Sequence, residues 1–455
     1  MPKKTFGKIS ANIAETNAGT RVDRAATPAA NRTPSIETVV VIPEYRKIKE
    51  LLDEGCPIVF VTGGAGTGKS TLIGWLENQY AGKTILCAPT GIAALTIGGK
   101  TLHSLCNFPP GWIIEQDINL KPKSPTLVAG ILIIDEISMV NANLLDAVSD
   151  FLKKNRKSTE PFGGISLVIV GDLFQLPPII TSTTRSLFKR EYDTAKFFSA
   201  HALKESDFEA VELTKPFRQT NKEFVQLLSN IREGTNLGET LESLNSNCDI
   251  TEDPPQGAVW LCPRHSDVDR VNLSRLNKLA GSPTSYTGIL TGAFKESQLP
   301  VPMHIELKIG AQVVLTNNTK DWVNGSVAVV TDLSQKTIKV RLLGAKKVVE
   351  VPTNTWEQYD YFVDETTKRV ERRVIGTFRQ IPAILAWAMT IHRSQGLTLD
   401  AVHLDLGVGA FETGQTYVAL SRVRDMSNLT LSRPIRFDDV KVDQDSSLFY
   451  KQIRE

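Results

Sequence analysis

The chain has 455 residues, which is long enough for several domains that each bury a core of their own. Hydrophobic residues make up 41% of it and no apolar stretch approaches the length of a membrane span, so an integral membrane protein is excluded. The net charge of only +2 excludes nucleic-acid binding driven by the whole molecule's field, and any such binding requires a locally basic cleft. The five cysteines form no C-x-x-C spacing, so neither a zinc site nor a disulfide framework is expected.

Residues 1–36 are rich in Ala, Thr and Asn and contain few large apolar side chains, which predicts a disordered tail. Basic residues outnumber acidic ones there. The tail is therefore either an ordinary solvated terminus or a weak nucleic-acid-binding arm. It lacks the apolar segment of a secretory signal, and nothing else indicates export, so we expect a cytoplasmic protein.

Short apolar runs alternate with helical patterns from residue 42 to about residue 178. The runs lie at 57–62, 83–89, 130–136 and 165–172. Such alternation predicts a parallel sheet covered by helices. Similar runs at 257–263, 380–391 and 401–407 predict a second α/β lobe. Between them the pattern changes to alternating β-type runs, which predicts a small antiparallel barrel inserted into that lobe.

The stretch that follows the first apolar run has the pattern G-x-x-x-x-G-K-[ST] and precedes a helical segment, which is the context of a phosphate-binding loop. Its glycines let backbone N–H groups close around phosphates, and the helix adds its positive N-terminal end. The predicted nucleotide-binding residues are Gly63, Gly64, Ala65, Gly66, Thr67, Gly68, Lys69, Ser70 and Thr71. Lys69 can reach the β- and γ-phosphates, and Ser70 can ligate Mg²⁺.

The run at 130–136 delivers Asp135 and Glu136 at the carboxyl end of a strand, where ligands of open parallel sheets bind. Asp135 would hold Mg²⁺, directly or through water, and Glu136 would polarise the water that attacks the γ-phosphate. The alternative is an acidic pair that only stabilises a helix start through the macrodipole. Beside the phosphate loop, the pair favours nucleotide hydrolysis.

Further blocks follow in a fixed order: "CAPTGIAALTIGGKTLHSL", "PFGGISLVIVGDLFQLPPI", "VELTKPFRQ", "GAQVVLTNNTKDWVNGSVAVV", "TIHRSQGLTLD" and "YVALSRVRD". Together with the two stretches above, they make the chain resemble the PIF-type DNA helicases, in the RecD-like branch of superfamily 1, which move 5′ to 3′ on single-stranded DNA. The resemblance runs from about residue 42 to about residue 433.

The resemblance implies an ATP site shared by two lobes. Gln175 in "GDLFQLPP" would be the γ-phosphate sensor, unless it is a structural glutamine. Arg218 in "PFRQ" and Arg422 in "ALSRV" would reach across the cleft to the γ-phosphate, because a planar, permanently charged guanidinium suits that task. For Arg218 an ordinary surface arginine is the alternative. Arg46 stands about where family members carry an adenine-reading Gln, which leaves nucleotide selectivity open.

The resemblance also implies a DNA path across both lobes. The implied DNA-binding residues are Thr90, Gly91 and His103 in the first lobe, and Thr390, His392, Arg393 and Gln395 in the second. Contacts of this kind ignore base sequence, as a translocating motor requires. Either histidine alone could be an ordinary packed or solvated one. Phe108 and Trp112 belong to a segment that forms a duplex-splitting wedge in the family, and for them core packing and strand separation remain equally open.

The implied fold is α/β, with two RecA-like P-loop NTPase lobes, a wedge insertion in the first and an SH3-like β-barrel insertion in the second. The expected divisions are the tail at 1–36, the first lobe at 37–190 with the wedge at about 106–126, the second lobe at 191–324 and 381–436, the barrel at 325–380, and a C-terminal tail at 437–455.

The implied function is an ATP-dependent 5′-to-3′ DNA helicase that uses Mg²⁺, translocates on single-stranded DNA and unwinds duplex or structured DNA in replication, recombination, repair or telomere maintenance. The expected partners are single-stranded DNA, single-strand/duplex junctions and replication or repair proteins, with no membrane, and we expect a monomer. It would be nucleoid-associated in a bacterium, and nuclear or mitochondrial in a eukaryote. Two rival functions remain: the motor subunit of a helicase–nuclease complex, and a DNA clamp whose ATPase is only a switch.

Overall fold

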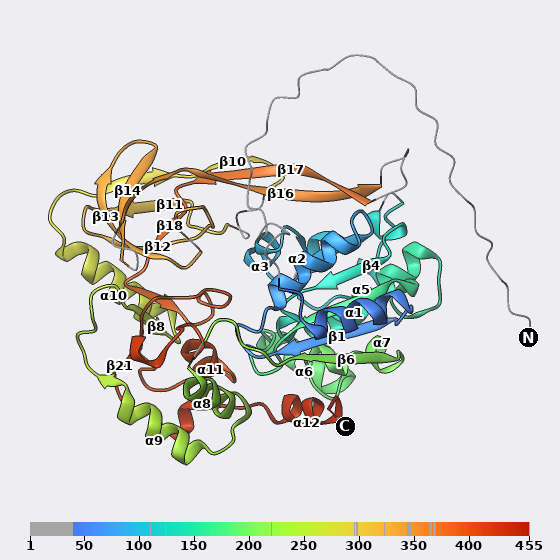
Figure 1. Ribbon diagram of the computed structural model, residues 1–455. Coiled ribbons are helices and arrows are strands. Elements are labelled where there is room, and N and C mark those ends of the chain that lie inside the picture. Colours follow the sequence, from blue (N-terminus) through green and yellow to red (C-terminus); the bar gives the residue numbers. More distant parts are fainter. Residues whose placement is uncertain are drawn as a thin grey trace, which may run out of the picture. The chain divides into compact units, whose positions relative to one another are not determined.

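A computed structural model describes residues 40–454 apart from positions 110, 123, 220, 295, 297–298, 323, 344–346, 364–365 and 367–369. The predicted tail at 1–36 lies outside the described residues. Within them, two parallel sheets carry helices and a set of antiparallel strands interrupts the second (Figure 1). The α/β class expected from the alternating apolar runs is therefore correct.

The first parallel sheet has the strand order β3-β2-β4-β5-β1-β6, and all its strand pairs are parallel. The strands are β1 (Ile58–Gly63), β2 (Thr84–Ala88), β3 (Lys100–Thr101), β4 (Ile131–Ile134), β5 (Ser166–Gly171) and β6 (Phe208–Leu213). Every residue of β1, β2 and β4 is buried, because helices cover both faces.

The helices of this lobe are α1 (Pro43–Asp53), α2 (Lys69–Gln79), α3 (Gly91–Thr96), α4 (Leu102–Cys106), α5 (Ala142–Arg156), α6 (Ser182–Glu191) and α7 (His201–Lys204). Alternate residues of β1 enter two different cores. Val59 and Val61 pack with residues of α1 and α2, whereas Ile58 and Phe60 pack with residues of α5. The period of two along a strand thus places one helix layer on each side of the sheet.

The expected boundary of the first lobe at residue 190 is placed too early. Strand β6, at 208–213, pairs with β1 in parallel, with Val59 opposite Glu209 and Val61 opposite Val211. As an edge strand, β6 is only half buried, so its sequence "FEAVEL" shows no continuous apolar run. That is why a pattern search for buried strands passes over it.

The second parallel sheet has the order β19-β8-β20-β21-β7, and its strand pairs are again parallel. The strands are β7 (Asp249–Ile250), β8 (Val259–Cys262), β19 (Ala388–Thr390), β20 (Val402–Leu404) and β21 (Leu429–Leu431); the helices are α8 (Lys222–Glu233), α9 (Leu237–Asn247), α10 (His265–Lys278) and α11 (Gln415–Leu420). Asn221 caps the start of helix α8, because its side chain accepts hydrogen bonds from the backbone N–H groups of Glu223 and Phe224.

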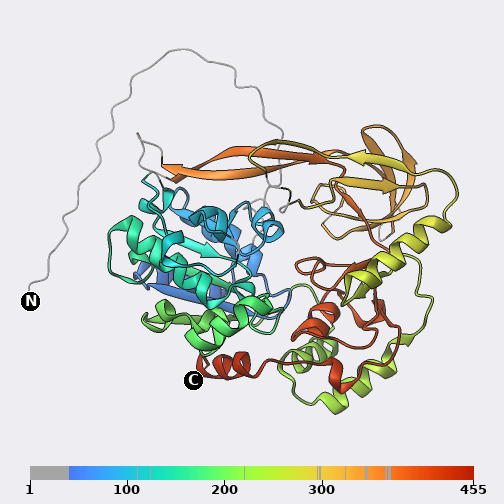
Figure 2. The same cartoon turned by 180° about the vertical axis from the view of Figure 1, so that it is seen from behind.

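Antiparallel strands interrupt the second lobe earlier in the chain than the expected barrel at 325–380. They are β9 (Thr284–Thr287), β10 (Ile289–Gly292), β11 (His304–Leu307), β12 (Gln312–Leu315), β13 (Val327–Leu333), β14 (Thr337–Leu342), β15 (Val348–Pro352), β16 (Asn354–Val363), β17 (Val370–Gln380) and β18 (Ala383–Leu385). A five-stranded sheet has the order β15-β14-β13-β12-β18, whereas β10, β17 and β16 form a separate ribbon, which the reverse view in Figure 2 also shows. Strand β16 contacts α3 of the first lobe.

The expected start of the barrel at residue 325 is wrong, because one hydrophobic core runs through both the second lobe and the antiparallel strands. Leu261 of β8, Val313 of β12 and Val418 of α11 belong to one continuous hydrophobic cluster. The short strands β9 to β12 therefore look in sequence like a continuation of the second lobe.

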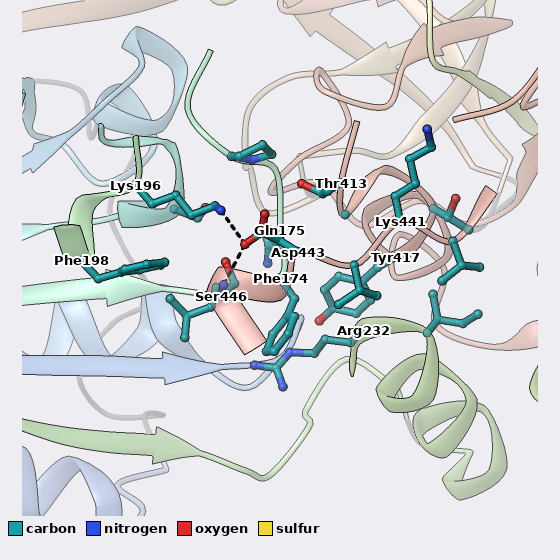
Figure 3. Close-up of a pocket in the computed structure, with 18 of the residues that line it drawn as sticks. Phe174, Gln175, Lys196, Phe198, Arg232, Thr413, Tyr417, Lys441, Asp443 and Ser446 are labelled. Carbon is teal, nitrogen blue, oxygen red and sulfur yellow. Dashed lines mark hydrogen bonds and ion pairs between the residues drawn. The ribbon is translucent and has the colours of Figure 1, made fainter. Parts of the chain in front are cut away.

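In the C-terminal segment expected as a tail at 437–455, the last described helix is packed against the first lobe, which corrects that expectation. Helix α12 (Gln444–Gln452) places the Phe449 ring parallel to that of Phe198, with centroids 4.5 Å apart. Tyr450 is buried in the first lobe's core. Lys196 pairs with Asp443, which caps this helix by accepting a hydrogen bond from the backbone N–H of Ser446 (Figure 3). Among the described residues, no helix has the length and apolar character needed to cross a bilayer.

Candidate nucleotide site

The phosphate loop lies between the end of β1 and the start of α2. Gly68 precedes α2 with a φ of +96°, and Gly66 has a φ of +76°, both in the left-handed region that favours glycine. A Cβ on Gly66 would lie 2.4 Å from the Cβ of Arg218, so a larger residue has no room there. The loop glycines thus serve both backbone conformation and close contact with a distant segment.

The ammonium group of Lys69 lies within this loop. Its Nζ donates to the carbonyl oxygens of Gly63 and Gly64, each at 2.8 Å. Burial lowers the pKa of Lys69, and the carboxylates of Asp172 and Glu136 oppose that effect. The loop is also tied to α1, because the Tyr45 hydroxyl donates to the Gly68 carbonyl at 2.7 Å. Arg46 is exposed on α1 and is not among the residues that line the nucleotide pocket.

Asp135 and Glu136 follow directly after β4. Asp135 Oδ1 accepts from the Glu136 N–H at 2.9 Å, and Glu136 has a left-handed φ of +50°. Burial raises the pKa of both carboxyl groups, and the charge of Glu136 adds to the rise at Asp135. A buried carboxylate beside a half-buried one favours a nearby cation, which a divalent metal or the Lys69 ammonium can supply.

Gln175 and Gln395 complete this end of the site. The Gln395 Nε2 donates to Glu136 Oε2 at 3.2 Å and to Gln175 Oε1 at 3.1 Å. Gln395 was expected at the DNA, but its amide lies between two residues of the nucleotide site. A second-lobe side chain therefore contacts the acidic pair directly.

A pocket of about 350 Å³ joins these groups to the second lobe. It is lined by Ala65, Gly66, Thr67, Gly68, Lys69, Ser70, Thr71, Glu136, Gln175, Phe217, Arg218, Gly396, Thr398, Arg422 and Arg424. The volume lies in the range of ligand pockets. Most of the predicted nucleotide residues thus meet in one pocket. Phe217, Thr398 and Arg424 also line it without having been predicted.

The two predicted arginines hold different positions. Arg218 lies on the connection between β6 and α8, and its Nη1 donates to the Ser421 carbonyl at 3.1 Å. Arg422 is 1% exposed, and its guanidinium donates to carbonyls of its own lobe. Burial lowers the pKa of Arg422 to about 9, and the charge of Arg218 adds to the decrease.

A buried network behind the loop was not predicted from sequence. Asp172 accepts from Arg232 Nε at 3.0 Å and from the Tyr417 hydroxyl at 2.9 Å, while the Ala65 N–H of the phosphate loop donates to that hydroxyl at 2.8 Å. Burial alone would raise the pKa of Asp172, but the charges of Arg232 and Lys69 outweigh it and hold the pKa below its ordinary value. Figure 3 shows Tyr417 and Arg232 beside each other in an adjoining pocket.

The predicted DNA-binding residues lie at the ends of strands in both lobes. Thr90 follows β2 and caps α3, where its Oγ1 accepts from the Ala93 N–H at 3.2 Å, and Gly91 is the first residue of that helix. His103 lies on α4. Thr390 ends β19, and its Oγ1 accepts from the Arg393 N–H at 3.2 Å. Each lobe thus presents its set at a carboxyl edge of its own parallel sheet.

The aromatic residues of the expected wedge are packed within the first lobe. Phe108 is buried, and its ring lies edge-on to that of Phe151 with centroids 6.0 Å apart. Trp112 packs against Phe188 of α6, with centroids 4.9 Å apart. In the second lobe, the half-buried ring of His392 lies parallel to the exposed ring of Phe411, with centroids 6.5 Å apart. For Phe108 and Trp112, these contacts favour the packing interpretation.

Known proteins resemble this chain in both sequence and fold. The profile of the PIF1-like helicase family matches residues 44–241. The "ATP-dependent DNA helicase PIF1" of Danio rerio is 35% identical, over 96% of this chain and 68% of its own length. The protein of that name from Homo sapiens is 33% identical, over 87% of this chain and 61% of its own length. The chain therefore spans about two thirds of the length of these relatives.

Solved structures give the same result. Unliganded Pif1 from Bacteroides sp has a TM-score of 0.84 and 34% identity, with 92% of this chain and 98% of that chain covered. The Bacteroides Pif1 bound to ssDNA has a TM-score of 0.67 at 35% identity, with 91% and 97% covered. A glycine loop after β1, an acidic pair after β4 and a second parallel sheet define a P-loop nucleoside triphosphatase with two lobes. Within that class, the chain belongs to the PIF1-like helicase family.

Proposed function

We propose that this protein is an ATP-dependent DNA helicase that moves 5′ to 3′ on single-stranded DNA and unwinds duplex DNA ahead of it. The observation that carries the proposal is the nucleotide pocket, to which the first lobe contributes the phosphate loop and Glu136 and the second lobe contributes Arg422. A pocket shared in this way can change when the lobes move. Relatives whose printed names include the same activity support the proposal.

In the proposed reaction, the phosphates of ATP replace the carbonyl oxygens of Gly63 and Gly64 as partners of Lys69. Glu136 accepts a proton from the attacking water, and Gln175 senses the γ-phosphate. Arg218 and Arg422 stabilise the charge that develops on the transferred phosphoryl group. The contact of Gln395 with both Glu136 and Gln175 gives the second lobe a direct influence on the water-activating end of the site.

The donor chemistry of the site also fits Mg²⁺. Ser70 and Asp135 would hold the ion through hard oxygen ligands, and among the described residues no cluster of three metal-binding side chains forms a complete cage. That matches the usual pattern for Mg²⁺, which combines one or two protein ligands with substrate phosphates and water. When bound, the ion supplies neutralisation of charge on the β- and γ-phosphates.

For the DNA path, we propose that Thr90, Gly91 and His103 grip the strand in the first lobe and that Thr390, His392 and Arg393 grip it in the second. Both sets lie at the carboxyl ends of parallel strands, which supports one continuous track. Backbone phosphates would be the main target, so binding would be independent of base sequence. We further propose RecA-like lobes, a wedge within 106–126 and an SH3-like barrel among the antiparallel strands.

The same proposal includes a monomer that acts on single-strand/duplex junctions with replication, recombination or repair proteins as partners. These points follow from the family's DNA chemistry. They predict no stable self-association in the absence of DNA.

Unwinding of tailed duplexes tests the proposed function. We expect strand separation with ATP and Mg²⁺ when the duplex carries only a 5′ single-stranded tail, and little when it carries only a 3′ tail. Lys69→Ala serves as the control, because it should abolish ATP hydrolysis without removing contacts to DNA. Separation from the 3′ tail would overturn the polarity, and ATP hydrolysis without separation of either substrate would favour the clamp.

A further inference from the structure

Three arginines from beyond β6 line the nucleotide pocket: Arg218, Arg422 and Arg424. Only the first two were expected from the family pattern. The three guanidinium groups differ in how many hydrogen bonds they already make to protein atoms. This difference decides which of them can bind a phosphate without breaking protein contacts.

Arg422 has few donors left to offer. Its Nε donates to the Val418 carbonyl at 2.7 Å, its Nη1 to the carbonyls of Ser394 and Leu397 at 3.2 Å each, and its Nη2 to the Ser421 hydroxyl at 2.7 Å. A guanidinium carries five N–H groups, so these contacts use nearly all of them. To turn toward a phosphate, Arg422 would have to leave several buried carbonyls without partners, which is costly. Its present contacts tie the segment 394–397 to α11.

Arg218 is partly committed as well. Its Nη1 donates to the Ser421 carbonyl, and its backbone packs against Gly66 of the phosphate loop. Burial lowers the pKa of this guanidinium. Arg218 is therefore fixed between the loop and the segment that carries Arg422.

Arg424 is in the opposite situation. It is exposed, yet it borders the same pocket. Among the described residues, its guanidinium makes neither a hydrogen bond nor an ion pair. Burial raises the pKa of Asp400, and the positive charge of Arg424 opposes that rise. The same charge lowers the pKa of Arg218. Arg424 thus brings an exposed positive charge to a pocket that already contains two cationic guanidinium groups.

We propose that Arg424 is a third phosphate-contacting arginine, which moves onto the γ-phosphate of the bound nucleoside triphosphate beside Arg218 and Arg422. The inference rests on the proposed function and adds a residue to it. Several cations around an empty pocket repel one another, and a triphosphate removes that repulsion. The planar fork of an exposed arginine can bond two phosphate oxygens without first breaking protein contacts.

The variants Arg424→Ala and Arg424→Lys test the proposal. Arg270→Ala is the matched control, because Arg270 is an exposed arginine on α10 of the same lobe, paired only loosely with Asp267 at 3.5 Å. We expect Arg424→Ala to lower kcat for ATP hydrolysis at saturating single-stranded DNA by ~100-fold, the scale found for removal of one charge-stabilising group. Arg424→Lys should recover part of that loss, and Arg270→Ala should match the wild type.

Two binding measurements separate this role from others. Because the proposed contact is with the γ-phosphate, Arg424→Ala should bind a fluorescent ADP analogue as the wild type does and should bind a fluorescent non-hydrolysable ATP analogue more weakly. Its affinity for single-stranded DNA without nucleotide should be unchanged. Wild-type turnover in Arg424→Ala would overturn the proposal, as would a loss confined to DNA affinity. If the wild-type protein itself hydrolysed no ATP, the proposed function would fail and this inference with it.

Discussion

The ammonium group of Lys69 is held by two carbonyls of its own loop, so the loop is already shaped around a position that a phosphate can occupy. We expect Lys69→Ala to abolish ATP hydrolysis and to leave the affinity for single-stranded DNA without nucleotide nearly unchanged, because this side chain contacts the loop rather than the DNA path. Steady-state phosphate release and fluorescence anisotropy of labelled DNA measure the two quantities. Turnover like that of the wild type would remove the basis of the site assignment.

At Glu136, a substitution can remove the proposed proton acceptor while keeping the size of the side chain, which Lys69→Ala does not do for the loop lysine. Glu136→Gln keeps the shape of the side chain and a partner for Gln395, but it cannot accept a proton from water. We expect ATP affinity to remain and hydrolysis to slow by at least ~100-fold, the usual scale for a positioned base. Single-turnover hydrolysis and equilibrium ATP binding give the two values. Weaker ATP binding with normal turnover would contradict the proposed role.

Residues of the site differ in how readily sequence reveals them. The phosphate loop and the acidic pair are local patterns, so both were found from spacing alone. Arg232 and Tyr417 reach Asp172 from positions 60 and 245 residues away, and no short motif marks such contacts. Arg424 could have been found, since it lies two residues after a predicted arginine. Gln395 was found, but only coordinates place its amide beside Glu136 rather than with Thr390 and His392.

Among the elements of the first lobe, the strands buried between neighbours were predicted and the edge strands β3 and β6 were not. Strand β1 gives a continuous apolar run because helices cover it on each side, whereas β6 alternates and escapes the pattern. Helix α12 is short and carries polar residues on most of its surface, so its sequence resembles a tail. What holds it is contact with the first lobe, which lies far away in sequence.

Helix α12 offers a direct test of that packing. Phe449→Ala should lower the midpoint of thermal unfolding through a loss of ~2 kcal/mol, because the ring stacks on Phe198 and also contacts Phe60. The neighbouring residue provides the control: Leu448 is 61% exposed, and its replacement by Ala should change stability by less than ~0.5 kcal/mol. Equal effects of the two substitutions would mean that α12 is not docked through Phe449.

Strand β20 carries a buried histidine that should make stability depend on pH. Burial lowers the pKa of His403 to about 4, while its ring contacts Trp260 and shares a hydrogen bond with Thr430. The ordinary pKa is about 6.5, so above that pH the group is neutral in both the folded and the unfolded chain and contributes nothing. As the pH falls from about 6.5 toward 4, only the unfolded chain gains the proton, and the folded state loses stability.

The expected size of this effect is ~2 kcal/mol at pH 5 relative to pH 7.5. His403→Asn keeps a partner for Thr430 but does not titrate, so its thermal midpoint should fall less over this interval than that of the wild type. The control is His304→Asn, because His304 makes a similar hydrogen bond to Thr287 but is exposed on β11. Identical pH profiles for the wild type and His403→Asn would contradict the assignment.

At the scale of the whole molecule, the nucleotide site is complete only when both lobes contribute to it. The Tyr417 hydroxyl links the Ala65 N–H of the phosphate loop to Asp172, and Arg232 of α8 pairs with the same carboxylate. Movement of the second lobe must therefore move groups bonded directly to the loop. This connection supplies a physical path by which DNA held across both lobes can alter hydrolysis.

If single-stranded DNA favours the closed arrangement, ATP hydrolysis should be slow alone and faster with DNA. A coupling free energy of ~1–3 kcal/mol would give roughly 5- to 150-fold stimulation. Because part of the grip on DNA is ionic, the DNA concentration for half-maximal stimulation should rise with salt. Titration of ATPase activity with oligonucleotides of mixed sequence at two salt concentrations measures both effects. Equal rates with and without DNA would exclude a motor with coupled lobes.

Tyr417→Phe tests whether this network carries the coupling. The change keeps the buried ring but removes the hydroxyl that joins the loop to Asp172, and the loss of such a hydrogen bond costs ~0.5–1.5 kcal/mol. DNA stimulation should therefore fall by roughly 2- to 10-fold. Tyr286→Phe is the control, because that buried hydroxyl bonds to the Ser334 carbonyl among the antiparallel strands, away from the nucleotide pocket. If both variants kept full stimulation, the signal would have to pass through another direct contact between the second lobe and the site, such as that of Gln395 with Glu136.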